Sequence, residues 1–241
     1  MNVSHSSAPK RPSKLLEALR DRSHTGGAGR LGFGAHSAGP KRRLVLVASI
    51  AVADLARLAA VAEAGADGIE VQVRSARELR AVTEATAGLG IPLGIALGGD
   101  IVADLDPTEV ATGIDWIRLS LAAGMAPLNW EKPARFMTIP PDLDVRRAPA
   151  LNLLEIDAVV IEAHGSNQGS LTIGDLLPLA MLGEILKKPL LMHGAIGFGP
   201  ALAGVAEQCG ANGLLVPVEA STAAATIGEY ARALEQQAGK A

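Results

Sequence analysis

Short apolar runs alternate with helix-length segments between residues 157 and 216, and this alternation constrains the fold more than any other feature. Helical segments separate three apolar runs, at residues 158–163, 190–192 and 213–216. Strand-length runs that alternate with helices are typical of βαβ units, whose strands pair in parallel. Residues 64–70 (AGADGIE) and 209–215 (CGANGLL) are similar to each other, which indicates that the chain repeats one kind of unit.

The alternation continues through residues 44–241 and predicts eight strands that alternate with helices or helical segments. The predicted strands are 44–48, 68–73, 91–97, 114–121, 135–139, 158–163, 190–192 and 213–216. The predicted helices are 52–64, 76–87, 108–112, 146–154 and 222–236, with two more after the sixth and seventh strands. Eight such units predict a single (β/α)8 barrel of the TIM type. The competing architecture is an open doubly wound sheet, but no G-x-G-x-x-G opens a helix after the first strand.

Composition excludes several classes of protein. Hydrophobic residues make up 49% of the chain but aromatic residues only 2%, so a surface that stacks nucleic-acid bases is not expected. Cys209 is the only cysteine, which rules out an intrachain disulfide and a thiolate metal cluster. No apolar run reaches the length of a membrane span, and no apolar signal core follows Met1. We therefore expect a soluble, cytoplasmic protein.

Residues 1–43 form a basic segment that we interpret as an N-terminal arm. They hold nine Lys and Arg residues against two acidic ones, whereas residues 44–241 hold thirteen against twenty-three. Leucines at helical spacing predict a short amphipathic helix over residues 13–22, and the remainder of the arm is expected to be a loop or disordered. We expect the arm to pack on its own acidic barrel or on a neighbouring subunit of a homo-oligomer. Binding to nucleic acid is disfavoured, because the acidic body would repel phosphates.

Polar residues in the middle of barrel strands are expected to point into the barrel or its mouth. Three alternate strands carry such pairs: Glu70 and Gln72, Arg118 and Ser120, and Glu162 and His164. Interior layers are built from alternate strands, so one layer should contain Glu70, Arg118 and Glu162. The next layer should lie at the C-terminal mouth, where barrel enzymes carry out their chemistry, with His193 beside it.

The candidate catalytic residues are therefore Glu70, Arg118, Glu162, His164 and His193. Because an unpaired buried charge is strongly unfavourable, the first three form either a structural ion network or part of a catalytic site. His164 is the predicted proton-transfer residue, since a nearby carboxylate raises the pKa of an imidazole and orients it. His193 is predicted to donate to a ligand or to brace its loop. A metal site from Glu162, His164 and His193 is an alternative without a close-spaced ligand motif, and no metal is expected.

Residues 193–200 (HGAIGFGP) form a glycine-rich loop. Its glycines allow a close approach of backbone to a ligand, and Pro200 suits the first turn of a helix. The N-terminus of a helix presents unpaired N–H groups and a positive dipole end to an anion. The loop therefore predicts a phosphate or carboxylate site at five residues: Gly194, Ala195, Ile196, Gly197 and Gly199.

Residues 157–169 (DAVVIEAHGSNQG) and 188–199 (KPLLMHGAIGFG) resemble the C-terminal half of nitronate monooxygenases and, more broadly, the FMN- and phosphate-binding TIM barrels. This resemblance, over residues 157–216, implies FMN as a cofactor, a phosphate on the glycine-rich loop and His164 as the catalytic histidine. Residues 216–219 (VPVE) stand where those families place a small Gly-Ser or Gly-Thr pair that completes the phosphate cup.

The expected function is that of a barrel enzyme acting on a small anionic metabolite, as an FMN-dependent oxidoreductase of the nitronate monooxygenase type. Proton transfer would involve Glu162 or His164, and Arg118 or backbone N–H groups would hold negative charge. One alternative is a cofactor-free lyase or isomerase of the phosphate-binding barrel type. A second is a non-catalytic barrel that serves as a binding or assembly subunit.

Overall fold

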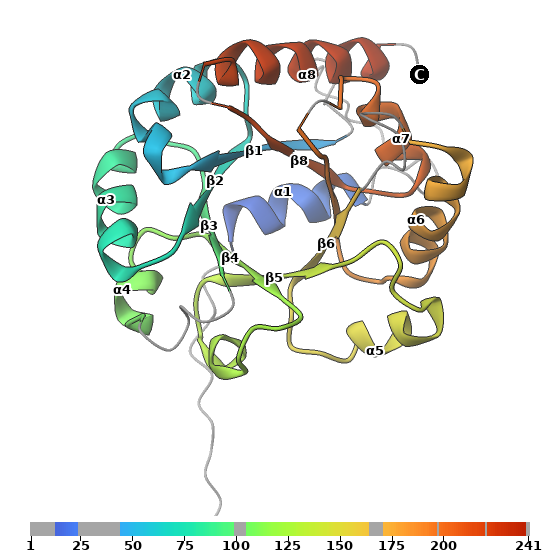
Figure 1. Ribbon diagram of the computed structural model, residues 1–241, viewed down its shortest axis with the longest axis horizontal. Coiled ribbons are helices and arrows are strands. Elements are labelled where there is room, and N and C mark those ends of the chain that lie inside the picture. The colour runs from blue at the N-terminus through green and yellow to red at the C-terminus, as the bar shows by residue number, and fades with distance from the viewer. Residues whose placement is uncertain are drawn as a thin grey trace, which may run out of the picture.

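The computed structural model describes residues 13–23, 44–98, 105–163, 171–196, 198–219 and 221–239. Within them, parallel strands close into a barrel in chain order, and the last strand pairs with the first. The strands are β1 (Val45–Ala51), β2 (Gly68–Val73), β3 (Leu93–Leu97), β4 (Trp116–Ser120), β5 (Ala134–Ile139), β6 (Ala158–Glu162), β7 (Leu190–His193) and β8 (Gly213–Pro217). Figure 1 looks into this barrel and shows the helices as an outer ring. The predicted (β/α)8 barrel is confirmed.

The outer helices bury the outward side of the strands in one large apolar cluster. They are α2 (Leu58–Glu63), α3 (Ala76–Thr86), α4 (Pro107–Ala111), α5 (Ala148–Leu151), α6 (Ile173–Ile185), α7 (Leu202–Gln208) and α8 (Ala223–Ala238). Local sequence signals start several of them. The Ser75 hydroxyl caps α3 by accepting from the amide of Glu78 at 3.2 Å. Thr172 and Asp175 form a capping box at the start of α6.

Two predicted helices are shorter than expected. The segment 52–64 begins as a 3-10 helix, η1 (Val52–Arg57), in which Asp54 departs from helical backbone angles, so that the α-helix starts only at Leu58. The segment 146–154 contains η4 (Val145–Arg147) and then α5, which ends at Leu151. The side chain of Asn152 then bonds the carbonyl of Ile185 and the amide of Lys187, which ties the chain to the end of α6. A further 3-10 helix, η3 (Ala126–Asn129), lies between β4 and β5, where none of the predicted helices was placed.

The barrel interior is apolar at the N-terminal ends of the strands and polar at their C-terminal ends. The apolar part consists of Val45, Val47, Trp116, Ala134, Phe136, Ala158, Val160, Leu191 and Leu215. Residues two positions further along a strand face the same side of the sheet. Except for Pro217 on β8, those next interior positions are polar: Ser49 on β1, Arg118 on β4, Thr138 on β5, Glu162 on β6 and His193 on β7. The C-terminal mouth is therefore the only end of these strands that offers polar interior groups among the described residues.

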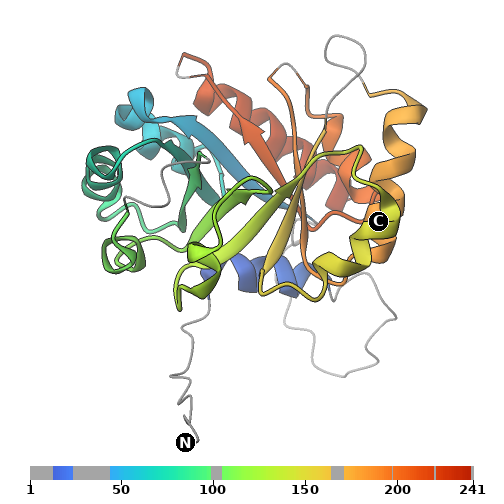
Figure 2. The same ribbon diagram turned by 60° about the horizontal axis from the view of Figure 1, so that its bottom comes forward.

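Helix α1 (Lys14–Ser23) closes the opposite, N-terminal end of the barrel. Leu15, Leu16 and Leu19 are buried against the apolar part of the barrel interior. Asp115, just before β4, holds the start of the helix: its carboxylate accepts from the amides of Lys14 and Leu15 at 2.9 and 3.0 Å, and from the Ser13 hydroxyl at 2.7 Å. Figure 1 shows α1 through the barrel, and Figure 2 shows it beneath the strands. The helix predicted over residues 13–22 is confirmed, and it serves as a plug.

Trp116 fills much of the apolar part of the barrel interior and leaves no room for a side chain at Gly94 on β3. A Cβ atom on Gly94 would lie 1.9 Å from Cε2 of Trp116. The indole ring stacks on Phe136, with ring centroids 5.9 Å apart. The next inward residue of β3 is Ala96, so this strand contributes only small side chains to the interior.

Candidate active site

The polar interior is centred on an ion pair between Arg118 of β4 and Glu70 of β2. The Nε–H of Arg118 donates to both carboxylate oxygens of Glu70, at 3.0 and 2.9 Å, and the Ser49 hydroxyl donates to Oε1 at 3.2 Å. The side chains of Arg118 and Glu70 are only 11% and 1% exposed. Burial opposes the charge of Arg118, but the Glu70 carboxylate, its hydrogen bond and the charge of Glu162 together raise the Arg118 pKa. Arg118 therefore interacts electrostatically with both Glu70 and Glu162, the other two residues of the predicted layer.

A cavity of about 220 Å³ lies at the C-terminal mouth beside this ion pair. Its polar lining comes from several strand ends and comprises Gln72, Arg74, Arg118, Ser120, Thr138 and Glu162. The Nη1 group of Arg118 donates to the Thr138 hydroxyl at 3.3 Å. The lining thus includes two arginine residues and one glutamate, and the Glu70 carboxylate bonds Arg118. Such a cavity suits a small polar ligand that carries negative charge.

Glu162 and His193 lie side by side at the end of β6 and β7. They are register partners in the parallel pair, and each follows an interior residue by two positions, Val160 and Leu191 respectively. Both are half-buried. Glu162 lines the cavity at the mouth, whereas His193 is not part of its lining. His164 lies outside the described residues, so its proposed contact with Glu162 stays a prediction.

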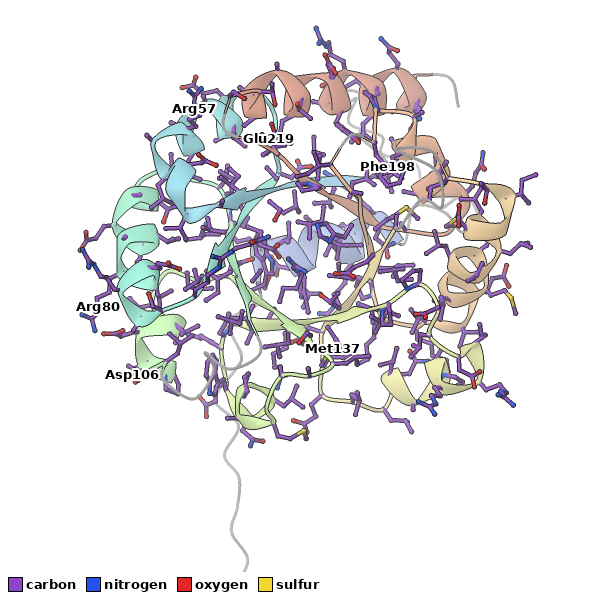
Figure 3. All side chains as sticks on the ribbon, viewed as in Figure 1. Arg57, Arg80, Asp106, Met137, Phe198 and Glu219 are labelled. Atoms are coloured by element: carbon purple, nitrogen blue, oxygen red, sulfur yellow. The ribbon has the colours of Figure 1, made fainter. Side chains whose placement is uncertain are left out.

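The glycine-rich loop after β7 is held by contacts within the protein. The amide of Gly194 donates to the carbonyl of Leu215 at 3.0 Å, and that of Phe198 to the carbonyl of Ala195 at 3.2 Å. The Tyr230 hydroxyl on α8 donates to the carbonyl of Phe198 at 2.6 Å, and Figure 3 shows Phe198 close to α7 and α8. The other predicted ligand-binding residues that are described, Ala195, Ile196 and Gly199, are exposed, and Gly197 lies outside the described residues.

Helix α7, which follows this loop, begins at Leu202 rather than near Pro200 and has only seven residues. Pro200 belongs instead to the turn that precedes it, where the amide of Leu202 donates to the carbonyl of Gly199 and that of Ala203 to Pro200. An anion on this loop therefore remains a prediction.

The end of β8 does not supply the second half of an FMN phosphate cup. Pro217 is the last residue of the strand and has no N–H group. The next amide, of Val218, donates to the carbonyl of Ser49 at 3.0 Å, and Glu219 places an exposed carboxylate beyond it. The Gly194 amide on the facing loop is also engaged. The described residues at this position therefore do not fit the phosphate of FMN.

Across the described parts of the chain, no group of three or more His, Cys, Asp or Glu side chains is arranged to hold a metal ion. The searched ranges leave out His164, which the sequence placed in an alternative metal site. In the same ranges no helix combines the length and the apolar character that crossing a bilayer requires.

Three residues of the site, Ser49, Arg74 and Thr138, were not identified from the sequence, and Arg74 lies just beyond the end of β2. Ser49 bonds Glu70, but the predicted first strand ended at residue 48, one position too early to include it. Thr138 bonds Arg118 and alternates with Phe136 on β5. Its mid-strand hydroxyl is the same signal that identified Ser120, and the rule for polar interior residues would have found it if applied to this strand as well.

No protein-family model matches the sequence, and no curated protein matches it. Solved structures do match. Tryptophan synthase from Mycobacterium tuberculosis aligns with a TM-score of 0.68 and 16% identity, over 93% of this chain and 99% of that chain. A mutant tryptophan synthase alpha-subunit from the hyperthermophile Pyrococcus furiosus aligns with a TM-score of 0.64 and 13% identity, over 77% of this chain and 97% of that one. The fold is thus a TIM barrel that resembles the tryptophan synthase alpha subunit, and these matches do not support the resemblance to nitronate monooxygenases.

Proposed function

We propose that this chain is a cofactor-free lyase or isomerase that acts on a small anionic metabolite at the C-terminal mouth of the barrel. One observation carries the proposal: a guanidinium group, Arg118, and a carboxylate, Glu162, line the same small cavity there. The likeness to tryptophan synthase alpha subunits supports it, because those proteins share the barrel. It supports a cofactor-free barrel enzyme better than an FMN-dependent oxidoreductase, and the poor fit of the β8 end to FMN points the same way.

The proposed roles follow from charge and position. Arg118 and Arg74 bind the negative group of the substrate or the charge that develops during reaction. Glu70 and Ser49 hold Arg118 in place from behind. Glu162 removes or donates a proton, assisted by His164, which follows it by two residues. His193 orients the substrate or the loop after β7. A phosphate group, if the substrate carries one, would lie toward that loop at Gly194, Ala195, Ile196, Gly197 and Gly199.

The proposal is tested by proton NMR in D2O with a panel of small carboxylated and phosphorylated metabolites. A lyase or isomerase that moves protons exchanges a C–H group of its substrate for deuterium or generates a new product signal. Glu162→Gln should lower that rate by roughly two to four orders of magnitude, the usual effect of losing a general acid or base. Glu155→Gln is the matched control, because Glu155 precedes the same strand at its other end and its side chain is 81% exposed.

Two further variants separate the histidines. His164→Gln should lower turnover with little change in substrate affinity, whereas His193→Gln should mainly weaken binding. Turnover that depends on His193 and not on His164 would reverse these roles. No turnover with any compound of the panel would favour the non-catalytic barrel, and a flavin that copurifies with the protein would contradict the cofactor-free proposal.

A further inference from the structure

We propose that the chain forms a two-fold symmetric homodimer in which α6 packs antiparallel against α6 of a second copy. The proposal does not depend on the proposed function. It concerns a face on the outside of the barrel, away from the mouth.

The exposed large apolar side chains are concentrated on this face. Of the eight that the described residues contain, five lie on α6 or on the segment directly after α5: Leu153, Leu154, Ile173, Leu177 and Met181. Ile173, Leu177 and Met181 are 79%, 61% and 51% exposed and follow one another at intervals of four residues. That spacing places them in one stripe along the helix.

Two further exposed leucines belong to the segment that is tied to the C-terminal end of α6. The Asn152 side chain joins the carbonyl of Ile185 and the amide of Lys187, at 3.1 and 2.9 Å. These bonds hold the segment of Leu153 and Leu154, which are 86% and 41% exposed, against the C-terminal end of α6. Figure 1 shows α5 and α6 as neighbours on the outer ring. The five exposed apolar side chains therefore lie along α6 and beside its C-terminal end.

The composition of α6 does not suit a helix that faces water. Leu179 and Leu182 on its inner side are buried against the barrel, so the helix is apolar on both sides. Its only charged residues are Asp175 and Glu184, and the Asp175 carboxylate accepts from the Thr172 amide and hydroxyl, both at 2.7 Å, in the capping box. A helix that is apolar all round is normally covered.

Charge placement selects a second copy of α6 in the antiparallel direction. In that arrangement Leu177 lies against Met181 of the partner subunit, and Glu184 lies beside the N-terminal end of the partner's α6, whose dipole favours a carboxylate. A parallel pair would bring two Glu184 carboxylates together. The antiparallel pairing also makes the same contact twice, as a two-fold axis requires.

The exposed area is sufficient for a modest dimer. The five side chains together present on the order of 500 Å² per copy, which is most of the roughly 800 Å² that each partner contributes to a standard interface. Gly174 and Glu184, which are exposed on the same helix, supply additional area.

The first test is the mass of the purified full chain by light scattering during gel filtration, over a range of concentrations. Wild-type protein should have twice the mass of the chain, and Leu177→Lys/Met181→Lys should halve it with an unchanged circular dichroism spectrum. Met125→Lys is the matched control, because Met125 is 71% exposed but lies outside the α6 face, and this variant should remain a dimer. A monomeric wild type, or a dimer that survives the double substitution, would overturn the proposal.

The second test does not depend on the stability of the lysine variant. Leu177→Cys and Met181→Cys proteins are oxidised separately and as a mixture. An antiparallel pair should cross-link efficiently only in the mixture, since residue 177 faces residue 181 of the partner. The native Cys209 is 4% exposed and does not compete. Cross-linking of each single variant with itself would indicate a parallel pair, and no cross-linking in any sample would remove α6 from the interface.

Discussion

The Nε–H group of Arg118 bridges both carboxylate oxygens of Glu70 across a strand that lies between them. Glu70 is the register partner of Gly94, and Arg118 that of Ala96, on the intervening β3. The side chain of Arg118 can reach Glu70 because β3 offers only these two small residues to the interior. Gly94 therefore leaves space for the Trp116 ring near the N-terminal ends of the strands. Ala96 leaves space for the ion pair near their C-terminal ends.

Arg118→Met should leave the Glu70 carboxylate buried without its guanidinium partner. We expect a loss of about 3–5 kcal/mol in the free energy of unfolding, the usual effect of breaking a buried ion pair from one side. The double variant Glu70→Leu/Arg118→Met should lose much less, because the buried Glu70 carboxylate is removed together with its guanidinium partner. Urea unfolding of the three proteins measures both values. Equal losses in the single and double variants would show that the two residues are not coupled.

Gly94→Ala should destabilise the barrel strongly. The added Cβ atom would collide with the Trp116 ring, which is 1% exposed and cannot move outward. Overpacking of this kind costs about 1–3 kcal/mol and sometimes more. Gly228→Ala is the control, because a Cβ atom there meets nothing within 4 Å and the residue lies inside α8. That variant should gain about 0.5–1 kcal/mol from helix propensity, and thermal unfolding compares the two.

Asp115→Ala should release α1 from the N-terminal end of the barrel. The carboxylate accepts from two helix amides and from the Ser13 hydroxyl, and losing a helix cap costs about 1–2 kcal/mol. Hydrogen exchange of α1 should become faster relative to that of the strands. If exchange in α1 rises no more than in β1, the carboxylate does not hold the plug.

The sequence predicted the barrel and much of its polar interior because both depend on periodicity. Alternating segments identified the eight units, and a polar residue at every second strand position identified Glu70, Arg118 and Glu162. The leucines of α1 showed that one helix face is buried but not against what, because they pack with residues of distant strands such as Trp116 and Leu191. The close contact of the Trp116 ring with Gly94 is likewise a long-range packing contact. The sequence of neither strand reveals it by itself. The anion site was predicted from the glycines of the loop, from the helix start expected at Pro200 and from the resemblance to phosphate-binding barrels. None of these reveals that the Gly194 amide already bonds the Leu215 carbonyl.

The hydroxyl of Tyr230 should titrate unusually late. Burial raises its pKa from 10.0 to about 12, and the group donates to the Phe198 carbonyl in the loop after β7. Tyr230 is the only tyrosine of the chain, so the absorbance of tyrosinate reports this residue alone. Between pH 10 and 12 the unfolded chain loses this proton while the folded chain keeps it, so that stability falls as pH rises.

The loss attributable to Tyr230 over this range should approach about 2–3 kcal/mol, since each pKa unit corresponds to about 1.4 kcal/mol. Tyr230→Phe lacks the titrating group and should not show this part of the alkaline loss. Below pH 10 the variant should be less stable than wild type by about 1 kcal/mol, because the Phe198 carbonyl loses its hydrogen bond. Denaturant unfolding at a series of pH values compares the two proteins. Parallel curves for wild type and variant through the alkaline range would show that the hydroxyl is not buried against the loop.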